Sequence, residues 1–378
     1  MITNIPIYIT DANCVTPLGF DLETNWEALV NGQSGIQFHE NFGNLTSVYA
    51  SNINVQKLNE SFLKVTNESQ FTKLEKMLIL ALHPIVTKNK ISDKSVLILS
   101  TTKGNISLLE NEELPIEDAQ LSTLAKKINT FFGFKTEPIV VSNACVSGVL
   151  AVSVAKRMIQ FGAYENAFVI AGDEISEFVL SGFNSFQAMS NSPCTPYDAE
   201  RNGVTLGEAS AAVFITTQKP INNAVAIIGD GAVNDANHIS GPSRTGDGLH
   251  KSIESAFKEA NIGKDKLDYI SAHGTATLYN DEMEAIAFSR SNIDTVAINS
   301  LKGYFGHTLG ASGLLEIVIG LQSLYHNELL ASKGFVSSGV SIPIPVLKEN
   351  RKKEITYFLK TASGFGGCNT AVLFEKIN

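Results

Sequence analysis

The stretch Val140-Val141-Ser142-Asn143-Ala144-Cys145-Val146-Ser147-Gly148 decides how the fold of this chain is interpreted. An apolar, β-branched run from Pro138 to Val141 leads into it and predicts a buried strand. Small residues from Val149 to Ala155 follow and predict a buried helix. Cys145 is therefore expected at a strand-to-helix junction, where the helix dipole and free backbone N–H groups favour a thiolate. We expect the pKa of this thiol to be lowered.

Cys145 also has a simpler interpretation. A cysteine among apolar residues is typical of an inert core position, and the junction by itself does not distinguish that case from a nucleophile. The second half of the chain supplies two histidines and a lysine in glycine-rich settings, which favours the nucleophile.

The composition limits the class of protein. The chain has 378 residues, 44% hydrophobic and 18% charged, which is typical of a globular protein. No apolar stretch is long enough for a membrane span, and the net charge of −9 argues against nonspecific nucleic-acid binding. The four cysteines are far apart and form no C-x-x-C pair, which favours a reducing cytoplasm over a zinc site or disulfides. The first ten residues predict a strand, not a signal peptide.

Strand-like and helix-like runs alternate along the chain, which predicts an α/β fold. We expect two similar halves, residues 1–218 and 219–378, joined by a polar linker over Thr216 to Asn223. The strands expected after the first are 96–100, 138–141, 167–171, 211–215, 224–228, 267–271, 295–298 and 370–374. The helices expected are 71–82, 121–132, 149–161, 248–260 and 310–325.

His273 follows an expected strand in the run Asp268-Tyr269-Ile270-Ser271-Ala272-His273-Gly274-Thr275-Ala276-Thr277. Ligand-binding loops gather at strand ends in layered α/β proteins, so we expect His273 at the edge of a pocket. A histidine taken alone is more often a hydrogen-bonded structural group, and the two threonines would then be surface residues.

A second run, Asn299-Ser300-Leu301-Lys302-Gly303-Tyr304-Phe305-Gly306-His307-Thr308-Leu309-Gly310-Ala311-Ser312-Gly313, carries a lysine and a histidine before an apolar helix. Its glycines allow close backbone approach. His307 near a helix N-terminus is expected to have a lowered pKa and a neutral ring that acts as a hydrogen-bond donor. Further on, the amides of Gly364-Phe365-Gly366-Gly367-Cys368-Asn369 form either half of an oxyanion hole or only a tight loop.

Taken together, these segments closely resemble the β-ketoacyl-acyl-carrier-protein synthases of the thiolase-like group, in their elongating Cys-His-His type. The resemblance covers nearly the whole chain and rests on ordered motifs. These are Val15-Thr16-Pro17-Leu18-Gly19, Trp26, Gly32-Gln33-Ser34-Gly35-Ile36, Thr195-Pro196-Tyr197-Asp198, Arg201-Asn202-Gly203, Leu206-Gly207-Glu208, His273-Gly274-Thr275-x-Thr277, Asn280-Asp281, Glu284, Lys302, Gly306-His307, Gly310-Ala311-Ser312-Gly313 and Glu316.

The resemblance implies a five-layered αβαβα fold of two related halves and a decarboxylative Claisen condensation. Cys145 would accept an acyl chain from acyl carrier protein, and malonyl-carrier protein would lose CO₂ and attack the resulting thioester. His273 and His307 would stabilise the enolate, and Lys302 would orient His273. Substrates would be carried on phosphopantetheine, with no other cofactor. A homodimer, or a heterodimer with a paralogue, is implied.

The resemblance also assigns the remaining residues of the site. The backbone N–H groups of Cys145 and Phe365 would form the oxyanion hole, and Phe365 would act as a gate. An ionic shell around Lys302 would consist of Asp281, Glu284 and Glu316. No metal is required, although a monovalent cation near Glu316 and Asn369 is compatible with the family. The residues expected to bind substrate are Thr275, Thr277, Phe183, Phe186 and Ser240.

The chain departs from the family pattern in several places. The segment between Lys103 and Cys145 is short, and Thr361-Ala362-Ser363 replaces the usual Asn-Ser-Phe. Phe186 and Gln187 stand where a smaller residue and a basic residue are common. These departures favour a specialised synthase, as in polyketide or aryl-polyene-like assembly, over housekeeping fatty-acid elongation.

Two rival functions remain open. A noncatalytic chain-length-factor-like subunit usually lacks the cysteine or a histidine, and a thiolase carries an asparagine-based motif where this chain has His273-Gly274-Thr275. A further expectation concerns the carrier protein. Lys64, Lys73 and Lys76, around the expected helix 71–82, form either a docking patch for an acidic carrier or a solvated helix face.

Overall fold

Strands from both halves of the chain build one large sheet in the computed structural model, which describes residues 5–68, 70–110, 116–220, 224–236 and 241–377. The first half contributes β1 (Tyr8–Val15), β4 (Ser95–Ser100), β5 (Ile139–Val141), β6 (Asn166–Asp173) and β8 (Ala209–Thr216). The second half contributes β9 (Ala224–Asn234), β10 (Tyr269–Ser271), β11 (Ala297–Asn299), β14 (Tyr357–Gly364) and β15 (Cys368–Ile377).

The strand order of this sheet repeats between the halves. The ten strands run β11-β10-β14-β15-β9-β1-β8-β6-β4-β5, with β9 and β1 adjacent at the centre. When the strands of each half are numbered along the chain, both halves have the order 3-2-4-5-1 from the outer edge inward. The expected relation between two halves is therefore visible in the topology, although the sequence showed no repeat.

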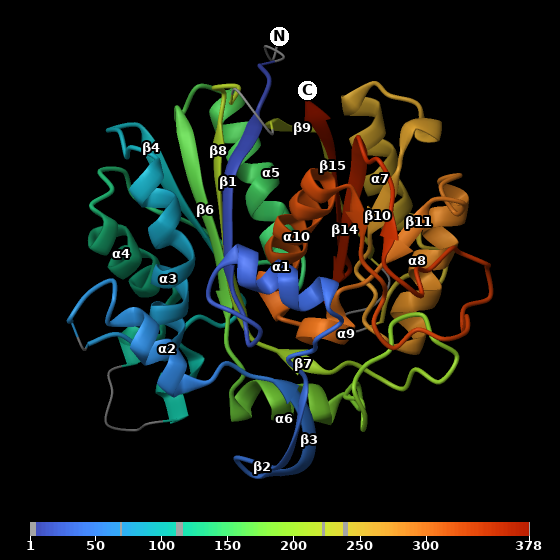
Figure 1. The fold of residues 1–378 in the computed structure, drawn as a ribbon, viewed down its shortest axis with the longest axis horizontal. Helices are drawn as coiled ribbons and strands as arrows, with labels where there is room; N and C mark the ends of the chain where they lie inside the picture. Colours follow the sequence, from blue (N-terminus) through green and yellow to red (C-terminus); the bar gives the residue numbers. More distant parts are fainter. Residues whose placement is uncertain (1–4, 69, 111–115, 221–223, 237–240, 378) are drawn as a thin grey trace.

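Helices cover both faces of each half of the sheet. The first half has α1 (Leu22–Val30), α2 (Val55–Phe62), α3 (Lys73–Lys88), α4 (Leu121–Phe132), α5 (Ser147–Gln160) and α6 (Glu177–Ser185). The second half has α7 (Asp247–Ala260), α8 (Leu278–Arg290), α9 (Lys302–Phe305) and α10 (Ser312–His326). Figure 1 shows α5 and α10 between the two halves of the sheet, with α3 and α4 outside one half and α7 and α8 outside the other. The fold is therefore the expected thiolase-like αβαβα arrangement of five layers.

The two central helices pack closely because glycines lie at their contact. A Cβ atom on Gly148 of α5 would lie only 2.6 Å from the backbone nitrogen of Leu314 in α10. A Cβ atom on Gly313 would likewise lie 2.5 Å from a methyl group of Val149. Only glycine permits this approach, and it brings the N-terminal ends of α5 and α10 together.

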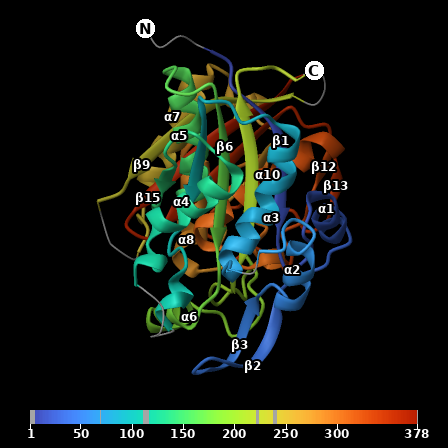
Figure 2. The ribbon, with the colours of Figure 1, turned by 90° about the vertical axis from the view of Figure 1, so that its left-hand side faces the viewer.

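Each outer layer has its own apolar core. Leu74, Leu78 and Leu82 of α3 belong to one apolar cluster with residues of α4, β4 and β6. Figure 2 shows α3 and α4 in front of the sheet from that side. Ile253 and Phe257 of α7 pack with α8 in the same way over the second half. The strands between are therefore buried on both faces, which explains why β4 and β8 are apolar or small at almost every position.

Short elements complete the described part of the chain. A small sheet contains β2 (Gln37–Phe42), β3 (Leu45–Ser51) and β7 (Leu206–Gly207), and a separate pair contains β12 (Glu328–Leu329) and β13 (Arg351–Lys352). Single 3-10 turns span Ile106–Glu110, Ile116–Ala119, Lys264–Lys266 and Leu309–Ala311. None of the helices in the described residues is long and apolar enough to cross a membrane.

Most expected elements are confirmed, with shifted ends. The first strand is the main error, because it was expected over residues 1–10 and instead runs from Tyr8 to Val15. Pro6 cannot donate a hydrogen bond to a sheet, and β1 pairs with β8 only from Tyr8 onward. Helix α3 extends to Lys88 instead of ending at Leu82. The expected linker begins as strand, since β8 includes Thr216, and residues 221–223 lie outside the described residues.

Candidate active site

The turn between β5 and α5 presents Cys145. Ala144 has a φ of 45°, a left-handed conformation that is costly for a residue other than glycine. The turn is held by Ser147, whose hydroxyl donates to the Ala144 carbonyl at 2.6 Å and accepts from the Asn143 N–H at 2.7 Å. Cys145 therefore lies two residues before the first residue of α5, as the sequence predicts. The strain at Ala144 was not foreseeable, because alanine gives no signal for it.

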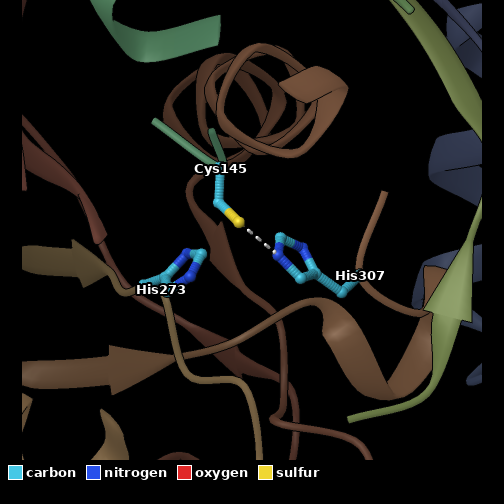
Figure 3. A group of neighbouring side chains, drawn as sticks. All are labelled: Cys145, His273 and His307. Atoms are coloured by element: carbon cyan, nitrogen blue, oxygen red, sulfur yellow. Dashed lines mark hydrogen bonds between the residues drawn. The ribbon is translucent and has the colours of Figure 1, made fainter. Parts of the chain in front are cut away.

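Two histidines from the second half of the chain meet Cys145. His307 Nε2 lies 3.0 Å from Cys145 Sγ, and the rings of His307 and His273 are 5.2 Å apart at 85°. The sulfur and one nitrogen from each ring all lie within 4.8 Å of one another, and all three residues are buried. Figure 3 shows both rings pointing toward the sulfur. The three residues that the sequence selected are thus brought together.

The expected lowering of the Cys145 pKa is wrong. Burial, together with the neighbouring Cys368, raises the pKa of this thiol to about 12. The positive charge of Lys302 and a hydrogen bond from the Phe365 backbone N–H lower this pKa, but by less than burial raises it. Position at a helix N-terminus therefore does not compensate for the loss of water around the sulfur. The resting group is a thiol that needs a proton acceptor.

Both histidines are neutral, as expected for His307. Burial and the nearby charge of Lys302 lower the pKa of His273 and of His307 well below 6.5, with a smaller contribution from Lys360. The sequence argument for His307 relied on a helix dipole, whereas burial is the main cause in the structure. A neutral ring at His307 is able to accept the proton of the Cys145 thiol.

Lys302 connects His273 to a buried carboxylate. Its Nζ atom lies 2.8 Å from Glu316 Oε1, 2.5 Å from the carbonyl oxygen of His273 and 3.4 Å from His273 Nδ1. An ammonium group only donates, so Nδ1 of His273 accepts and the ring proton lies on Nε2. Lys302 thus contacts both the carbonyl oxygen and the ring of His273, the residue that it was expected to orient.

A second buried lysine, Lys360 of β14, was missed by the sequence analysis. Its Nζ atom lies 2.6 Å from Glu316 Oε2 and donates to the carbonyl oxygens of Ser271 and Ala272. The available signal was a lysine in an otherwise apolar or small run, Tyr357-Phe358-Leu359-Lys360-Thr361-Ala362. Buried lysines need ionic partners, so this position predicts a hidden carboxylate.

The expected ionic shell around Lys302 is only partly correct. Glu316 pairs with Lys302, but Asp281 and Glu284 instead accept backbone N–H groups of the loop that carries His273. Glu284 accepts from His273 N at 2.9 Å and from Gly274 N at 2.6 Å, and Asp281 accepts from Thr275 N at 2.9 Å. The two carboxylates therefore shape the loop without pairing with Lys302.

The surroundings of Glu316 do not fit a monovalent cation. Both of its carboxylate oxygens already face lysine ammonium groups, so an added cation would meet two positive charges. Asn369 is also engaged, because its side chain accepts from Ser363 Oγ at 2.8 Å and donates to Asp235 Oδ2 at 3.0 Å. The carboxylate oxygens of Glu316 and the side-chain oxygen of Asn369 therefore each already have a protein partner.

A cavity of about 830 Å³ opens onto the sulfur. The residues that line it include Cys145, His273, His307, Thr275, Thr277, Phe183, Phe186, Phe365 and Asn369. The hydroxyl groups of Thr275 and Thr277 are 2.9 Å apart. Ser240, which was also expected to bind substrate, lies outside the described residues. The volume is in the range of small-molecule pockets.

Three aromatic rings form one wall of this cavity. The Phe365 ring is 5.6 Å from the Phe183 ring and 5.7 Å from the Phe186 ring. Phe365 and Phe186 are 37% and 59% exposed, so neither is packed in the core. Phe365 lies in the turn between β14 and β15, and its backbone N–H donates to the Cys145 sulfur. The same residue thus contributes a partly exposed ring and a backbone amide to the site.

Two of the three lysines of the predicted docking patch have partners within the protein, which weakens that prediction. Lys73 Nζ lies 2.6 Å from Glu208 Oε1, which is buried, and Lys76 donates to Asn59 at 2.8 Å. Lys64 is exposed. The sequence placed all three lysines near one helix but did not reveal that Lys73 compensates a buried carboxylate.

Two family models match this chain along most of its length. The family model described as "Beta-ketoacyl synthase, N-terminal domain" matches residues 4–220, and the model of the C-terminal domain of the same family matches residues 225–335. The 3-oxoacyl-[acyl-carrier-protein] synthase 2 of Vibrio harveyi is 25% identical over 410 residues, covering 98% of this chain and 98% of the relative.

Solved structures with similar folds include ketosynthases. One is the ketosynthase ApeO in complex with its chain length factor ApeC from Xenorhabdus doucetiae, with a TM-score of 0.86, 24% identity and 98% coverage of both chains. Another is the ishigamide ketosynthase/chain length factor, with a TM-score of 0.88, 19% identity and 100% coverage of both chains. At these identities the two structures establish the fold alone.

Proposed function

Because the chain belongs to the β-ketoacyl synthase family, we propose that it is a β-ketoacyl-[acyl-carrier-protein] synthase, an acyltransferase that lengthens an acyl chain by decarboxylative Claisen condensation. The observation that carries the proposal is the buried contact of 3.0 Å between Cys145 Sγ and His307 Nε2, with His273 and Lys302 beside it. A thiol, a base and a fixed hydrogen-bond donor around one cavity are the groups that this reaction needs.

The first half-reaction transfers an acyl group to Cys145. The thiol proton moves to His307 Nε2 as the sulfur attacks the thioester carbonyl of an acyl-carrier protein. The Cys145 and Phe365 backbone N–H groups hold the developing oxyanion. The bond from carbon to the pantetheine sulfur then breaks, and that sulfur takes the proton from His307. The products are an acyl thioester on Cys145 and a free carrier thiol.

The second half-reaction forms the carbon–carbon bond. Malonyl-carrier protein loses CO₂, and the electron pair of the broken bond forms an enolate whose oxygen accepts hydrogen bonds from His273 and His307. The α-carbon attacks the acyl carbonyl, the Cys145 sulfur leaves, and a solvent proton restores the thiol. Thr275 and Thr277 line the path of the pantetheine arm, and the phosphopantetheine of the carrier is the only prosthetic group in this scheme.

Two other functions are less well supported by the site. A chain-length-factor-like subunit has no need for a complete set of Cys145, His273, His307 and Lys302, and here these groups are in mutual contact. A thiolase would use a second acid–base cysteine. It would also carry an asparagine-based motif, and this chain has His273-Gly274-Thr275 in its place.

We propose a specialised substrate within this reaction, in polyketide or aryl-polyene-like assembly. The aromatic wall of Phe183, Phe186 and Phe365 supports the proposal, because flat conjugated chains stack on aromatic rings better than flexible saturated chains do. Elongation of saturated fatty-acid chains is the alternative pathway.

The proposed partners are an acyl carrier protein and a second chain, either an identical copy or a paralogue. Strand β5 is the outer strand of the first half of the sheet, so one of its edges has no partner strand in the described residues. Such an edge is suited to pairing with another chain. A cytoplasmic location and a division into units 1–218 and 219–378 complete the proposal. Sedimentation measurements on the purified protein, alone and with its paralogue, test the assembly.

The reaction is tested by intact-protein mass spectrometry after incubation with acyl-carrier proteins of different chain length and unsaturation. A mass increase equal to one acyl group, located at Cys145, supports the synthase and identifies the primer. If the folded protein acquires no acyl group from any donor, the chain-length-factor-like function becomes the better explanation.

A further inference from the structure

A continuous hydrogen-bonded chain runs behind His307. On one side its Nε2 atom contacts Cys145 Sγ at 3.0 Å, and on the other its Nδ1 atom lies 3.1 Å from Ser312 Oγ. Ser312 Oγ in turn donates to Glu316 Oε1 at 3.4 Å. All four residues are buried, and Cys145 and His307 also line the cavity. Ser312 is the first residue of α10, and Glu316 is one turn further along the same helix.

The direction of each hydrogen bond follows from Glu316, the last residue of this hydrogen-bonded series. Glu316 pairs with two lysines, and their charges keep its pKa low, so the carboxylate can only accept. The single hydroxyl proton of Ser312 therefore points to Glu316, and Ser312 Oγ must accept from His307. The proton of the neutral His307 ring then lies on Nδ1. Its Nε2 atom keeps a free lone pair that faces the Cys145 thiol.

His273 is held in the opposite tautomer. Lys302 Nζ, which can only donate, lies 3.4 Å from His273 Nδ1, so the ring proton of His273 lies on Nε2. Two buried neutral histidines in one cavity thus differ in the single respect that matters for proton transfer. One is set to accept a proton at Nε2, and the other is set to donate a hydrogen bond from Nε2.

We propose that Ser312 is a positioning residue that makes His307 the base for Cys145, an inference that rests on the proposed synthase function. With Nδ1–H held by Ser312, Nε2 takes the thiol proton as the Cys145 sulfur bonds to the acyl carbon. The same proton then passes to the departing pantetheine sulfur, and His307 returns to its starting tautomer. No proton is gained or lost over this half-reaction.

The same hydroxyl also permits the second half-reaction. Rotation of the Ser312 hydroxyl from Glu316 toward His307 Nδ1 turns Ser312 from an acceptor into a donor. His307 then carries its proton on Nε2, after exchange of one ring proton with water in the cavity, and donates to the enolate. A lysine or a backbone amide behind Nδ1 would allow only this second state, because neither can accept.

The test separates the two half-reactions in the full-length protein. Ser312→Ala removes the acceptor for Nδ1–H and its bias toward the base tautomer, while Ser312→Thr keeps a hydroxyl. Ser323→Ala is the matched control, because Ser323 is buried on the same helix and its hydroxyl has no partner in the described residues. Acylation of Cys145 is followed by mass spectrometry, and CO₂ release from malonyl-carrier protein is measured with enzyme that has already been acylated.

We expect Ser312→Ala to slow acylation at least about tenfold and to slow CO₂ release distinctly less, since loss of general-base assistance costs about a hundredfold or more. Ser312→Thr should recover most of the acylation rate, and Ser323→Ala should match the wild type. Equal slowing of both half-reactions by Ser312→Ala, or no slowing of either, would overturn the proposal.

A third measurement distinguishes failure of this inference from failure of the proposed function. Alkylation of Cys145 by iodoacetamide at neutral pH needs no carrier and no acyl chain, but it still needs removal of the thiol proton. Ser312→Ala should slow it about tenfold relative to Ser323→Ala. If the wild type is never acylated but Ser312→Ala is alkylated more slowly than Ser323→Ala, the proposed function is wrong and the role of Ser312 stands. If acylation is normal and alkylation is unchanged by Ser312→Ala, the role of Ser312 is wrong.

Discussion

Cys145 Sγ and His307 Nε2 lie 3.0 Å apart although 162 positions separate the two residues in the sequence. Burial raises the pKa of the thiol to about 12 and lowers the pKa of His307 well below 6.5, so thiol and imidazole are both neutral at rest. A neutral pair has no stable thiolate and works by transferring the proton during attack. The predictions below depend on this pair and its surroundings.

Replacing Cys145 by Ala should abolish acyl-enzyme formation, because no other sulfur lies beside His307 in the described residues. Condensation activity should fall by at least about a thousandfold. Intact-protein mass spectrometry and product formation check the result. Cys14→Ala is the matched control, since Cys14 is a buried cysteine in β1, and it should still be acylated. An acyl adduct on Cys145→Ala would show that another group is the nucleophile.

Replacing Lys302 by Met should destabilise the protein by about 3 kcal/mol, because it leaves Glu316 buried with one ammonium group instead of two. Urea unfolding followed by circular dichroism measures the change. The comparison is Lys352→Met, which removes the exposed ion pair with Glu328 and should change stability by less than about 1 kcal/mol. Similar effects of the two variants would argue against a structural role for the buried pair.

Folding stability should fall on the acid side of pH 6.5 because of His273 and His307. Their pKa values in the folded protein are lowered, so below 6.5 the unfolded chain binds protons that the folded protein does not bind. The two residues together should cost about 2.7 kcal/mol per pH unit in that window. The double variant His273→Asn, His307→Asn should lose this slope. The difference between the two unfolding curves isolates the contribution of the pair.

At alkaline pH the folding stability should depend on pH in the opposite direction, because of Cys145. Its pKa is 9.0 in a model peptide and about 12 in the folded protein, so above pH 9 the unfolded chain loses a proton that the folded protein keeps. Stability should therefore fall with rising pH by about 1.4 kcal/mol per unit between these values. Cys145→Ala should remove this part of the slope. An unchanged slope in that variant would contradict the raised pKa.

Replacing Phe186 by Ala should change substrate preference more than stability. The side chain is 59% exposed, but its ring packs against Phe365 at the wall of the cavity. We expect the ratio of kcat/KM for conjugated over saturated acyl chains to fall about threefold to tenfold, the value of one aromatic contact. Phe178→Ala is the matched control, because Phe178 is on α6, the helix that ends at Ser185 directly before Phe186, is 57% exposed and does not line this cavity.

Acyl-carrier proteins loaded with saturated and conjugated chains of equal length provide the test of that preference. A strong preference of the wild type for saturated medium chains would contradict the specialised synthase. It would leave the condensation reaction itself untouched, because the chemistry at Cys145 does not depend on chain saturation.

Several parts of the fold were predictable because they depend on short-range patterns. The apolar run of β4 and the small-residue run of α5 identify buried elements, since only burial on all sides tolerates such sequences. The end of α3 was not predictable, since the helix continues past Pro84. The repeated strand order 3-2-4-5-1 was also not predictable, because no sequence similarity between the halves is visible and strand order depends on the packing of layers.

In the site, too, some residues were predictable from the sequence and others were not. Cys145, His273, Lys302 and His307 stood out because each lies in a motif of glycines and small residues at the end of a strand. Ser312 and Lys360 did not stand out as functional, although Ser312 contacts His307 directly and Lys360 pairs with Glu316. Their importance comes from what faces them across the interface between the halves, and no local pattern records that.

By itself the sequence determined which chemical groups are available and which strand or helix carries each one. Those properties depend on residue type and on periodicity over a few positions. Only the tertiary structure decided that the ends of α5 and α10 meet, that the Cys145 thiol is protonated and that the two histidines hold opposite tautomers. A pKa and a tautomer depend on every neighbour within a few ångströms and on the exclusion of water, and those neighbours come from both halves of the chain.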